Sequence, residues 1–222
     1  RMPGDAELLT VPEAAVIASV TVREVNRVID EKILPERFYT LEGGRHIHVA
    51  ACPLMGFYFH AAKVLTPEER ALIIGRLSDR IGPEMTRRPI ADWRKRSQPT
   101  DWTISDGFLT VSLWGFATGA EGRQAKLAEA RKMVTDNPDI LGGTPVIRGT
   151  RVPVHDIAAS VAAGLSGERI RLAYPGLDDH AIELATIYAE ATPPRGRPKR
   201  LAALASGARV VSKRRIPRRR HG

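Results

Sequence analysis

Positive charge is concentrated at the C-terminal end of this chain, which separates the part that can form a core from the part that cannot. Eleven of the 34 Lys and Arg residues lie within 193–222, a stretch that holds no Asp or Glu. The other 23 Lys and Arg residues and all 25 Asp and Glu residues lie in 1–192, so this part carries a net charge of −2. The net charge of +9 for the whole chain therefore comes from the tail. A block of like charge does not collapse, and it typically serves as an arm for an acidic partner, most often nucleic acid.

The composition of the whole chain predicts a globular protein of the cytoplasm. Hydrophobic residues make up 43% and charged residues 27% of the chain, and 222 residues are enough for two small domains. A single cysteine, Cys52, excludes an internal disulfide and favours a reducing compartment. No apolar run approaches the roughly 20 residues of a membrane span, so we expect no membrane association and no signal peptide.

Two short helices with a tight joint are predicted near the N-terminus. Thr10 is a favourable N-cap for a helix that continues to Ala18, with a proline and a glutamate in its first turn. Thr21 is placed to cap a second helix over 22–32, whose apolar residues recur at three- and four-residue spacing. This order of elements is the helix-turn-helix pattern.

A β-hairpin is predicted directly after these helices, with strands at 38–41 and 45–49 around the turn residues 42–44. The runs Leu9–Ala15 and Ser19–Val25, followed by Arg45-His46-Ile47, resemble the winged helix-turn-helix head of MerR-like and excisionase-like regulators. The resemblance implies that the second helix enters the major groove of DNA and that the hairpin, as a wing, approaches the adjacent backbone.

The resemblance makes a set of polar residues the candidate DNA contacts: Thr21, Arg23, Asn26 and Arg27 on the second helix, and Arg45, His46 and His48 in the wing. The chemistry of these side chains suits DNA binding. Arginine forms two hydrogen bonds with guanine and asparagine two with adenine, while a wing arginine attracts phosphate regardless of sequence. The alternative is that Arg23 and Arg27 form only a solvated face of the helix.

The middle of the chain, 63–120, contains no recognisable chemistry. Thr66 and Glu69 form a capping box at a helix start, and residues 102–113 predict a hairpin with Asp106-Gly107 as its type I′ turn. We interpret this segment as a connector and a possible dimer contact.

The second half begins with a helix over 122–134 and continues into a loop or hairpin, 140–153, that glycines and prolines keep out of helical structure. Three helices follow, at 154–163, 167–174 and 178–190. A glycine-containing turn joins the first two helices, and Ser166 in this turn caps the second. This order of elements is again the helix-turn-helix pattern.

Residues 136–189 resemble the small antitoxin domain of VapB-like proteins, long filed as a domain of unknown function. The motifs that carry the resemblance are Asn137-Pro138, Gly142-Gly143-Thr144-Pro145, Arg148-Gly149-Thr150-Arg151 and Tyr174-Pro175-Gly176-Leu177. The resemblance implies a PIN-like, VapC-type ribonuclease toxin as the partner and operator DNA as the autoregulatory target.

The basic tail has three possible uses. Residues 194–200 resemble an AT-hook, in which Arg195 and Arg197 would follow a narrow minor groove. The resemblance to VapB-like antitoxins implies instead that the tail wraps the toxin and places a basic side chain among its metal-binding carboxylates. The residues for that role are Arg197, Lys199, Arg200, Leu201 and Leu204. The third possibility is a solubilising arm.

No catalytic or metal-binding constellation emerges from the sequence. His46 and His48 are two residues apart, His155 is followed by Asp156, and Cys52 has no companion, so no zinc spacing is present. We therefore expect no enzyme activity, no metal and no cofactor.

The predicted fold is mainly α with short β-hairpins, in four segments: a winged helix-turn-helix (1–62), a connecting helix and hairpin (63–120), a helix-turn-helix-like antitoxin domain (121–192) and a basic tail (193–222). The predicted function is a DNA-binding antitoxin that acts as a homodimer. The alternative is a stand-alone MerR-like or excisionase-like regulator without a toxin.

Overall fold

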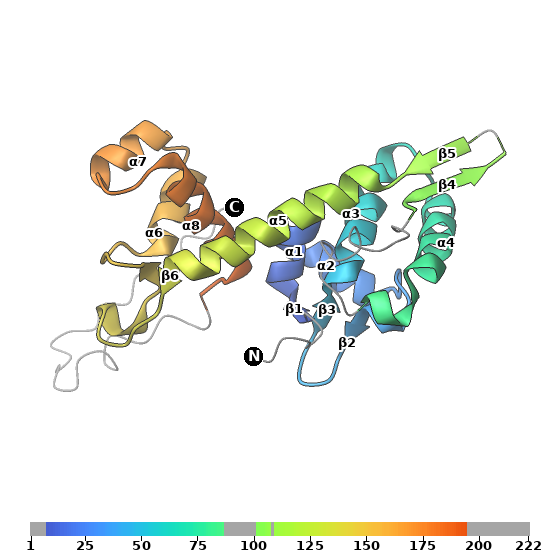
Figure 1. Ribbon diagram of the computed structural model, residues 1–222, viewed down its shortest axis with the longest axis horizontal. Helices are drawn as coiled ribbons and strands as arrows, with labels where there is room; N and C mark the ends of the chain where they lie inside the picture. Colours follow the sequence, from blue (N-terminus) through green and yellow to red (C-terminus); the bar gives the residue numbers. More distant parts are fainter. Residues whose placement is uncertain (1–7, 87–100, 108, 195–222) are drawn as a thin grey trace, which may run out of the picture.

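The computed structural model describes residues 8–86, 101–107 and 109–194. In this part of the chain the protein is mainly helical with short antiparallel β-sheets, which confirms the predicted fold class. A long helix, α5 (Trp114–Met133), crosses the molecule and joins two groups of elements, one at each end (Figure 1). Short 3-10 turns lie at η1 (Glu36–Phe38), η2 (Val49–Ala51), η3 (Ala61–Lys63) and η5 (Leu141–Gly143).

The N-terminal group begins with β1 (Leu8–Thr10), α1 (Val11–Ala18) and α2 (Val22–Asp30). The two helices confirm the predicted helix pair, although α2 ends two residues earlier than expected. Each helix starts with a capping box, because Glu13 accepts from the Thr10 amide at 2.8 Å and Glu24 from the Thr21 amide at 2.7 Å.

The predicted wing is present as β2 (Tyr39–Thr40) and β3 (His46–His48), which pair antiparallel. The sequence did not predict β1, which pairs with the other edge of β3 and makes the sheet three-stranded in the order β1-β3-β2. Three residues are too few for an alternating pattern, so β1 depends on its long-range pairing with β3.

The middle of the chain packs on the head. The head ends with α3 (Cys52–His60), and the middle of the chain comprises α4 (Pro67–Thr86, interrupted by non-helical Gly82), β4 (Thr103–Asp106) and β5 (Leu109–Ser112). The predicted turn at Asp106-Gly107 is wrong by one residue, because Asp106 belongs to β4 and pairs with Leu109.

The prediction that a helix begins at Gly122 is also wrong, because α5 begins eight residues earlier, at Trp114. Glycines at 115, 119 and 122 disfavour a helix intrinsically. Ala117 and Ala120 are nevertheless buried on the core side of α5, and this packing overrides the low propensity.

The C-terminal group consists of β6 (Val134–Thr135), β7 (Val146–Ile147), α6 (Val154–Ala162), α7 (Gly167–Ala173) and α8 (Asp179–Ala191). The predicted loop or hairpin, 140–153, contains the 3-10 turn η5 and strand β7, and in it Gly142 and Gly143 have φ of +64° and +83°. Ser166 caps α7 as predicted, by accepting from the Arg169 amide at 3.3 Å.

Two apolar cores lie at opposite ends of α5. The first includes buried side chains from Leu9 of β1 to Leu127 of α5, which the head and the middle segment share, and also Ala191 at the end of α8. The second includes Val134, Ile157 and Ala185 and belongs to the C-terminal group. In the described ranges no helix is long and apolar enough to cross a membrane, and no group of His, Cys, Asp or Glu is arranged to hold a metal ion.

Candidate nucleic-acid interface

The exposed face of α2 brings together the four helix residues predicted to contact DNA. Thr21, Arg23, Asn26 and Arg27 line one shallow surface hollow, because Asn26 and Arg27 follow Arg23 by three and four residues and Thr21 is the N-cap of the same helix. The opposite face of α2 carries Val25, Val28 and Ile29 into the first core. Burial of that apolar face therefore fixes which residues of α2 point to solvent.

The wing contributes Arg45 to the same surface. Its Nη1 donates to Oδ1 of Asn26 at 3.0 Å, and its Nη2 lies 2.8 Å from Oδ1 of Asp30. Asn26 is itself oriented by a hydrogen bond from its Nδ2 to the carbonyl of Val22 at 3.0 Å. The predicted wing arginine is thus adjacent to α2, but its guanidinium is already engaged by two residues of that helix.

Arg27 is also paired within the helix. Its Nε donates to Oε1 of Glu31 at 2.8 Å, and this hydrogen bond raises the pKa of the guanidinium above its ordinary value. Both side chains are about half exposed, so the pair adds little stability. Arg27 remains cationic and is held in an orientation along the helix.

Arg23 differs from these two arginines, because it makes no hydrogen bond or ion pair with any residue in the described ranges. The surface also carries three carboxylates, those of Glu24, Asp30 and Glu31. Together with Arg23, Arg27 and Arg45 they give it no net charge. A surface of this kind offers directional donors and acceptors without the general attraction of a basic patch.

The two wing histidines lie on β3 and not on α2. His46 and His48 alternate with buried Ile47, so both are on the side of the sheet away from the core. Nδ1 of His46 lies 3.3 Å from the carbonyl of Gly44, which ties this ring to the turn of the wing. The tail residues Arg195, Arg197, Lys199, Arg200, Leu201 and Leu204 lie outside the described residues.

The acidic partners of the arginines were missed by the sequence reasoning. Glu31 follows Arg27 by four residues, a spacing that signals a helical ion pair. Asp30 had no such signal, because its partner Arg45 lies 15 positions along the chain and meets it only when the wing folds back on α2.

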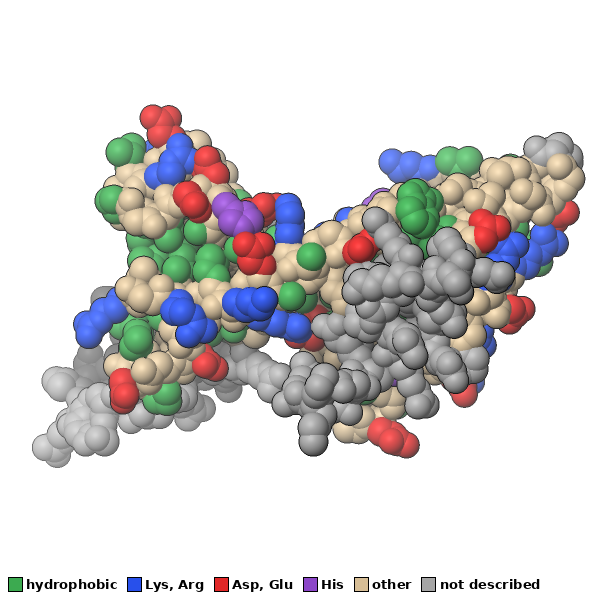
Figure 2. Space-filling view, in the orientation of Figure 1, with side chains coloured by type: hydrophobic (Ala, Val, Ile, Leu, Met, Phe, Trp, Pro, Cys, Tyr) green, Lys and Arg blue, Asp and Glu red, His purple; other side chains and the backbone are tan. Residues whose placement is uncertain are grey.

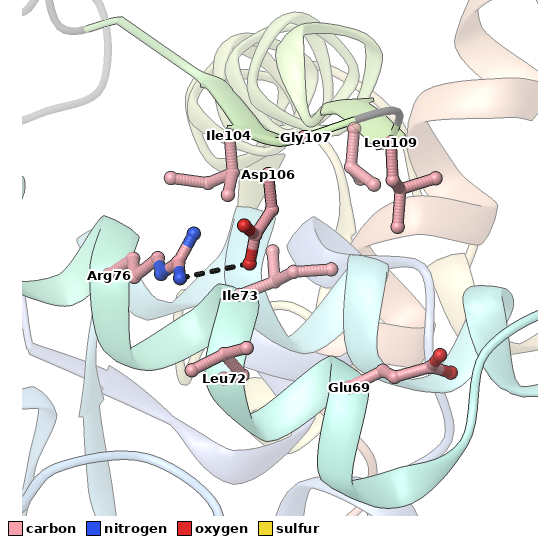
Figure 3. A pocket seen from close by; sticks show the side chains of 9 residues that line it. Glu69, Leu72, Ile73, Arg76, Ile104, Asp106, Gly107 and Leu109 are labelled. Carbon is pink, nitrogen blue, oxygen red and sulfur yellow. Dashed lines mark hydrogen bonds and ion pairs between the residues drawn. The ribbon is translucent and has the colours of Figure 1, made fainter.

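A second surface feature is an apolar groove of about 320 Å³ between α4 and the β4–β5 hairpin (Figure 3). Leu72 and Ile73 of α4 face Ile104 and Leu109 of the hairpin across it. The ion pair of Arg76 with Asp106, at 3.0 Å, bridges the two elements in the same view. No sequence pattern predicted this groove.

The comparisons with known proteins place the chain in a family. It is 52% identical over 220 residues to uncharacterized protein y4eO of Sinorhizobium fredii (strain NBRC 101917 / NGR234), an alignment that covers 99% of this chain and 97% of that protein. The chain belongs to the y4eO family. Within it, residues 134–189 match the family described as "Protein of unknown function (DUF433)", and we call them the DUF433 unit. No solved structure matches the chain significantly.

The DUF433 unit coincides with the second core. Its matched range begins at the first residue of β6 and ends two residues before the end of α8. The candidate nucleic-acid interface lies outside it, on the other side of α5 (Figure 1). This chain therefore combines a winged head and a DUF433 unit.

Proposed function

We propose that this protein is a DNA-binding antitoxin of a type II toxin–antitoxin module. In this proposal the head binds operator DNA, and the C-terminal half captures a PIN-like, VapC-type ribonuclease in the cytoplasm. The protein would act as a homodimer. The observation that carries the proposal is the joint surface of α2 and the wing, where Thr21, Arg23, Asn26 and Arg27 face solvent beside Arg45.

The chemistry of this surface supports DNA binding. An exposed helix with arginine and asparagine side chains is suited to read base edges in the major groove. Because the surface is electrically neutral, it does not provide the sequence-independent affinity that DNA-binding proteins draw from phosphate contacts. The eleven basic residues of 193–222 are the natural source of that affinity.

The DUF433 unit supports the antitoxin part of the proposal, because this family is often found in toxin–antitoxin-like contexts. Capture of a nuclease also suits the tail. A PIN-like active site is a cluster of carboxylates around a metal ion, and an arginine placed among them would replace the cation.

Co-expression tests the antitoxin assignment. The product of the adjacent gene should arrest growth when expressed alone, and the full chain should co-purify with it and restore growth. A variant that ends at Thr192 should lose rescue if the tail blocks the nuclease. If the neighbour is harmless alone and never binds the chain, the antitoxin assignment is wrong and a stand-alone regulator takes its place.

Titration of DNA tests the head. The probe is a duplex that carries the region upstream of the protein's own gene, compared with a random duplex of equal length. Arg23→Ala should weaken binding to the first duplex by about 1–3 kcal/mol and reduce the preference for it. Lys63→Ala, with the same change of charge away from α2, should leave the preference intact. Removal of the tail should chiefly flatten the salt dependence for both duplexes.

A further inference from the structure

The guanidinium of Arg45 joins the wing to α2. Arg45 follows the wing turn, and two of its nitrogens reach Asn26 and Asp30, at 3.0 and 2.8 Å. Asn26 and Asp30 are four residues apart, so they lie one above the other on the same face of α2. An amide oxygen and a carboxylate at this spacing match the fork of an arginine.

This arrangement conflicts with a role for Arg45 as a phosphate contact. Two of its five N–H groups are directed to Asn26 and Asp30, and the carboxylate of Asp30 offsets its positive charge, so its attraction for phosphate is weakened. If the guanidinium left both acceptors, the carboxylate of Asp30 would face the DNA backbone without a partner. Arg23 has no such obligation in the described part of the chain, so it is the arginine of this surface that is available to DNA.

We propose that Asn26 and Asp30 form a clasp that holds Arg45, and through it fixes the wing against α2. Arg45 is then a positioning residue, and Asp30 is a specificity determinant that suppresses sequence-independent binding by the head. The consequence for DNA rests on the proposed function, whereas the mechanical role of the clasp does not.

Two variants separate the clasp from a phosphate contact. Asp30→Asn removes the ion pair. Arg45→Lys keeps the positive charge but lacks the planar guanidinium whose two terminal nitrogens reach Asn26 and Asp30 together. With the clasp, both should lower the ratio of affinities for the upstream and random duplexes, each by about tenfold. Asp30→Asn should also bind the random duplex more tightly, since a carboxylate no longer faces the backbone.

A phosphate contact predicts the opposite pattern. Arg45→Lys would then keep both affinities nearly unchanged, because a lysine also attracts phosphate. Asp30→Asn would tighten binding to both duplexes and preserve their ratio, because it would free Arg45. Either result overturns the clasp as a specificity device. Glu42→Gln is the matched control, since it removes one negative charge from the wing without touching the clasp and should leave the ratio unchanged.

Hydrogen exchange of the free protein tests the clasp without DNA. Amide exchange in the wing turn, residues 41–46, should accelerate in Asp30→Asn and Arg45→Lys but not in Glu42→Gln. Unchanged exchange in the first two variants overturns the mechanical role. If the wild type binds both duplexes equally, the proposed DNA recognition fails, and the exchange result still decides whether the clasp holds the wing.

Discussion

Single side chains join elements that are distant in the sequence, and Arg148 is the clearest case. It follows β7, and its guanidinium donates from Nε to the carbonyl of Lys132 at 3.0 Å and from Nη2 to that of Val134 at 3.3 Å. The first carbonyl lies in the last turn of α5, where helix carbonyls lack intrahelical partners and the helix dipole favours a cation, and the second belongs to the residue that follows the helix. Arg148 therefore caps α5 from the DUF433 unit.

The motif Arg148-Gly149-Thr150-Arg151 provides a matched pair of variants. Arg148→Ala should destabilise the protein by about 1 kcal/mol, because two charge-assisted hydrogen bonds are lost at a partly solvated site. Arg151 is exposed and makes no hydrogen bond or ion pair with the described residues, so Arg151→Ala should change stability by less than about 0.5 kcal/mol. Denaturant midpoints of the two variants check this, and equal midpoints would contradict the capping role.

Side chains that act on near neighbours were predictable, and side chains with distant partners were not. The N-caps Thr21 and Ser166 and the capping box of Thr66 with Glu69 were all predicted, and in the structure each of these side-chain hydrogen bonds joins residues three apart. The candidate contacts on α2 share a face because the helix repeat places them there. The link from Arg45 to Asp30 depends on the fold, so no local spacing signals it.

At the scale of elements, the head is held together by the close approach of α3 to α1. A Cβ added to Gly56 of α3 would lie 2.9 Å from the carbonyl oxygen of Ala18 and 3.2 Å from Phe116 of α5. Three helices therefore meet at a position where only a glycine fits.

Alanine substitutions at two helical glycines test this packing. Gly56→Ala should cost about 1–3 kcal/mol, because backbone and an aromatic ring must move to admit the methyl group. Gly75→Ala, at an exposed position of α4 with open space around the added Cβ, should stabilise the protein by up to about 1 kcal/mol through helix propensity. Thermal unfolding of both variants measures the difference, and a gain in stability at Gly56 would contradict the packing described.

The elements that the sequence predicted well are those with strong local signals. The helix pair of the head and α6, α7 and α8 have caps and apolar periodicity, and their predicted bounds lie within two residues of the observed ones. By contrast, β1 and the first two turns of α5 are specified by what they pack against, and no pattern within them reveals this.

At the scale of the whole molecule, the two cores are connected through α5 and through its contacts with α8. Lys126 of α5 pairs with Glu183 of α8, and His180 Nε2 lies 2.8 Å from Oε1 of Glu129. Charged side chains of both signs are interspersed over α5 and α8 in Figure 2. The hydrogen bond with Glu129 raises the pKa of His180 above its ordinary value of 6.5.

This contact makes the packing of α8 on α5 dependent on pH. Because the folded-state pKa of His180 is raised, its contribution to stability is fully present below pH 6.5 and is lost as the pH rises through the raised value. Glu129→Gln should remove this contribution, so the stability difference between wild type and variant should shrink as the pH rises. Unfolding midpoints measured across this range check the slope.

The comparison between wild type and variant is needed because another histidine titrates with the opposite sign. Burial lowers the pKa of His155, so its contribution to stability falls as the pH is lowered. The Glu129→Gln substitution leaves His155 unchanged. A difference between the two proteins that stays constant with pH would contradict the role of His180.

The 20 residues of α5 set a distance and an angle as well as a connection. A helix of this length spans about 30 Å, and each residue added within it advances the far end by about 1.5 Å and rotates it by about 100°. A one-residue insertion in α5 between the two cores would therefore turn the DUF433 unit relative to the head and would oppose the packing of α8 on α1. Changes of length that preserve this phase come in steps of about seven residues, two full turns of the helix.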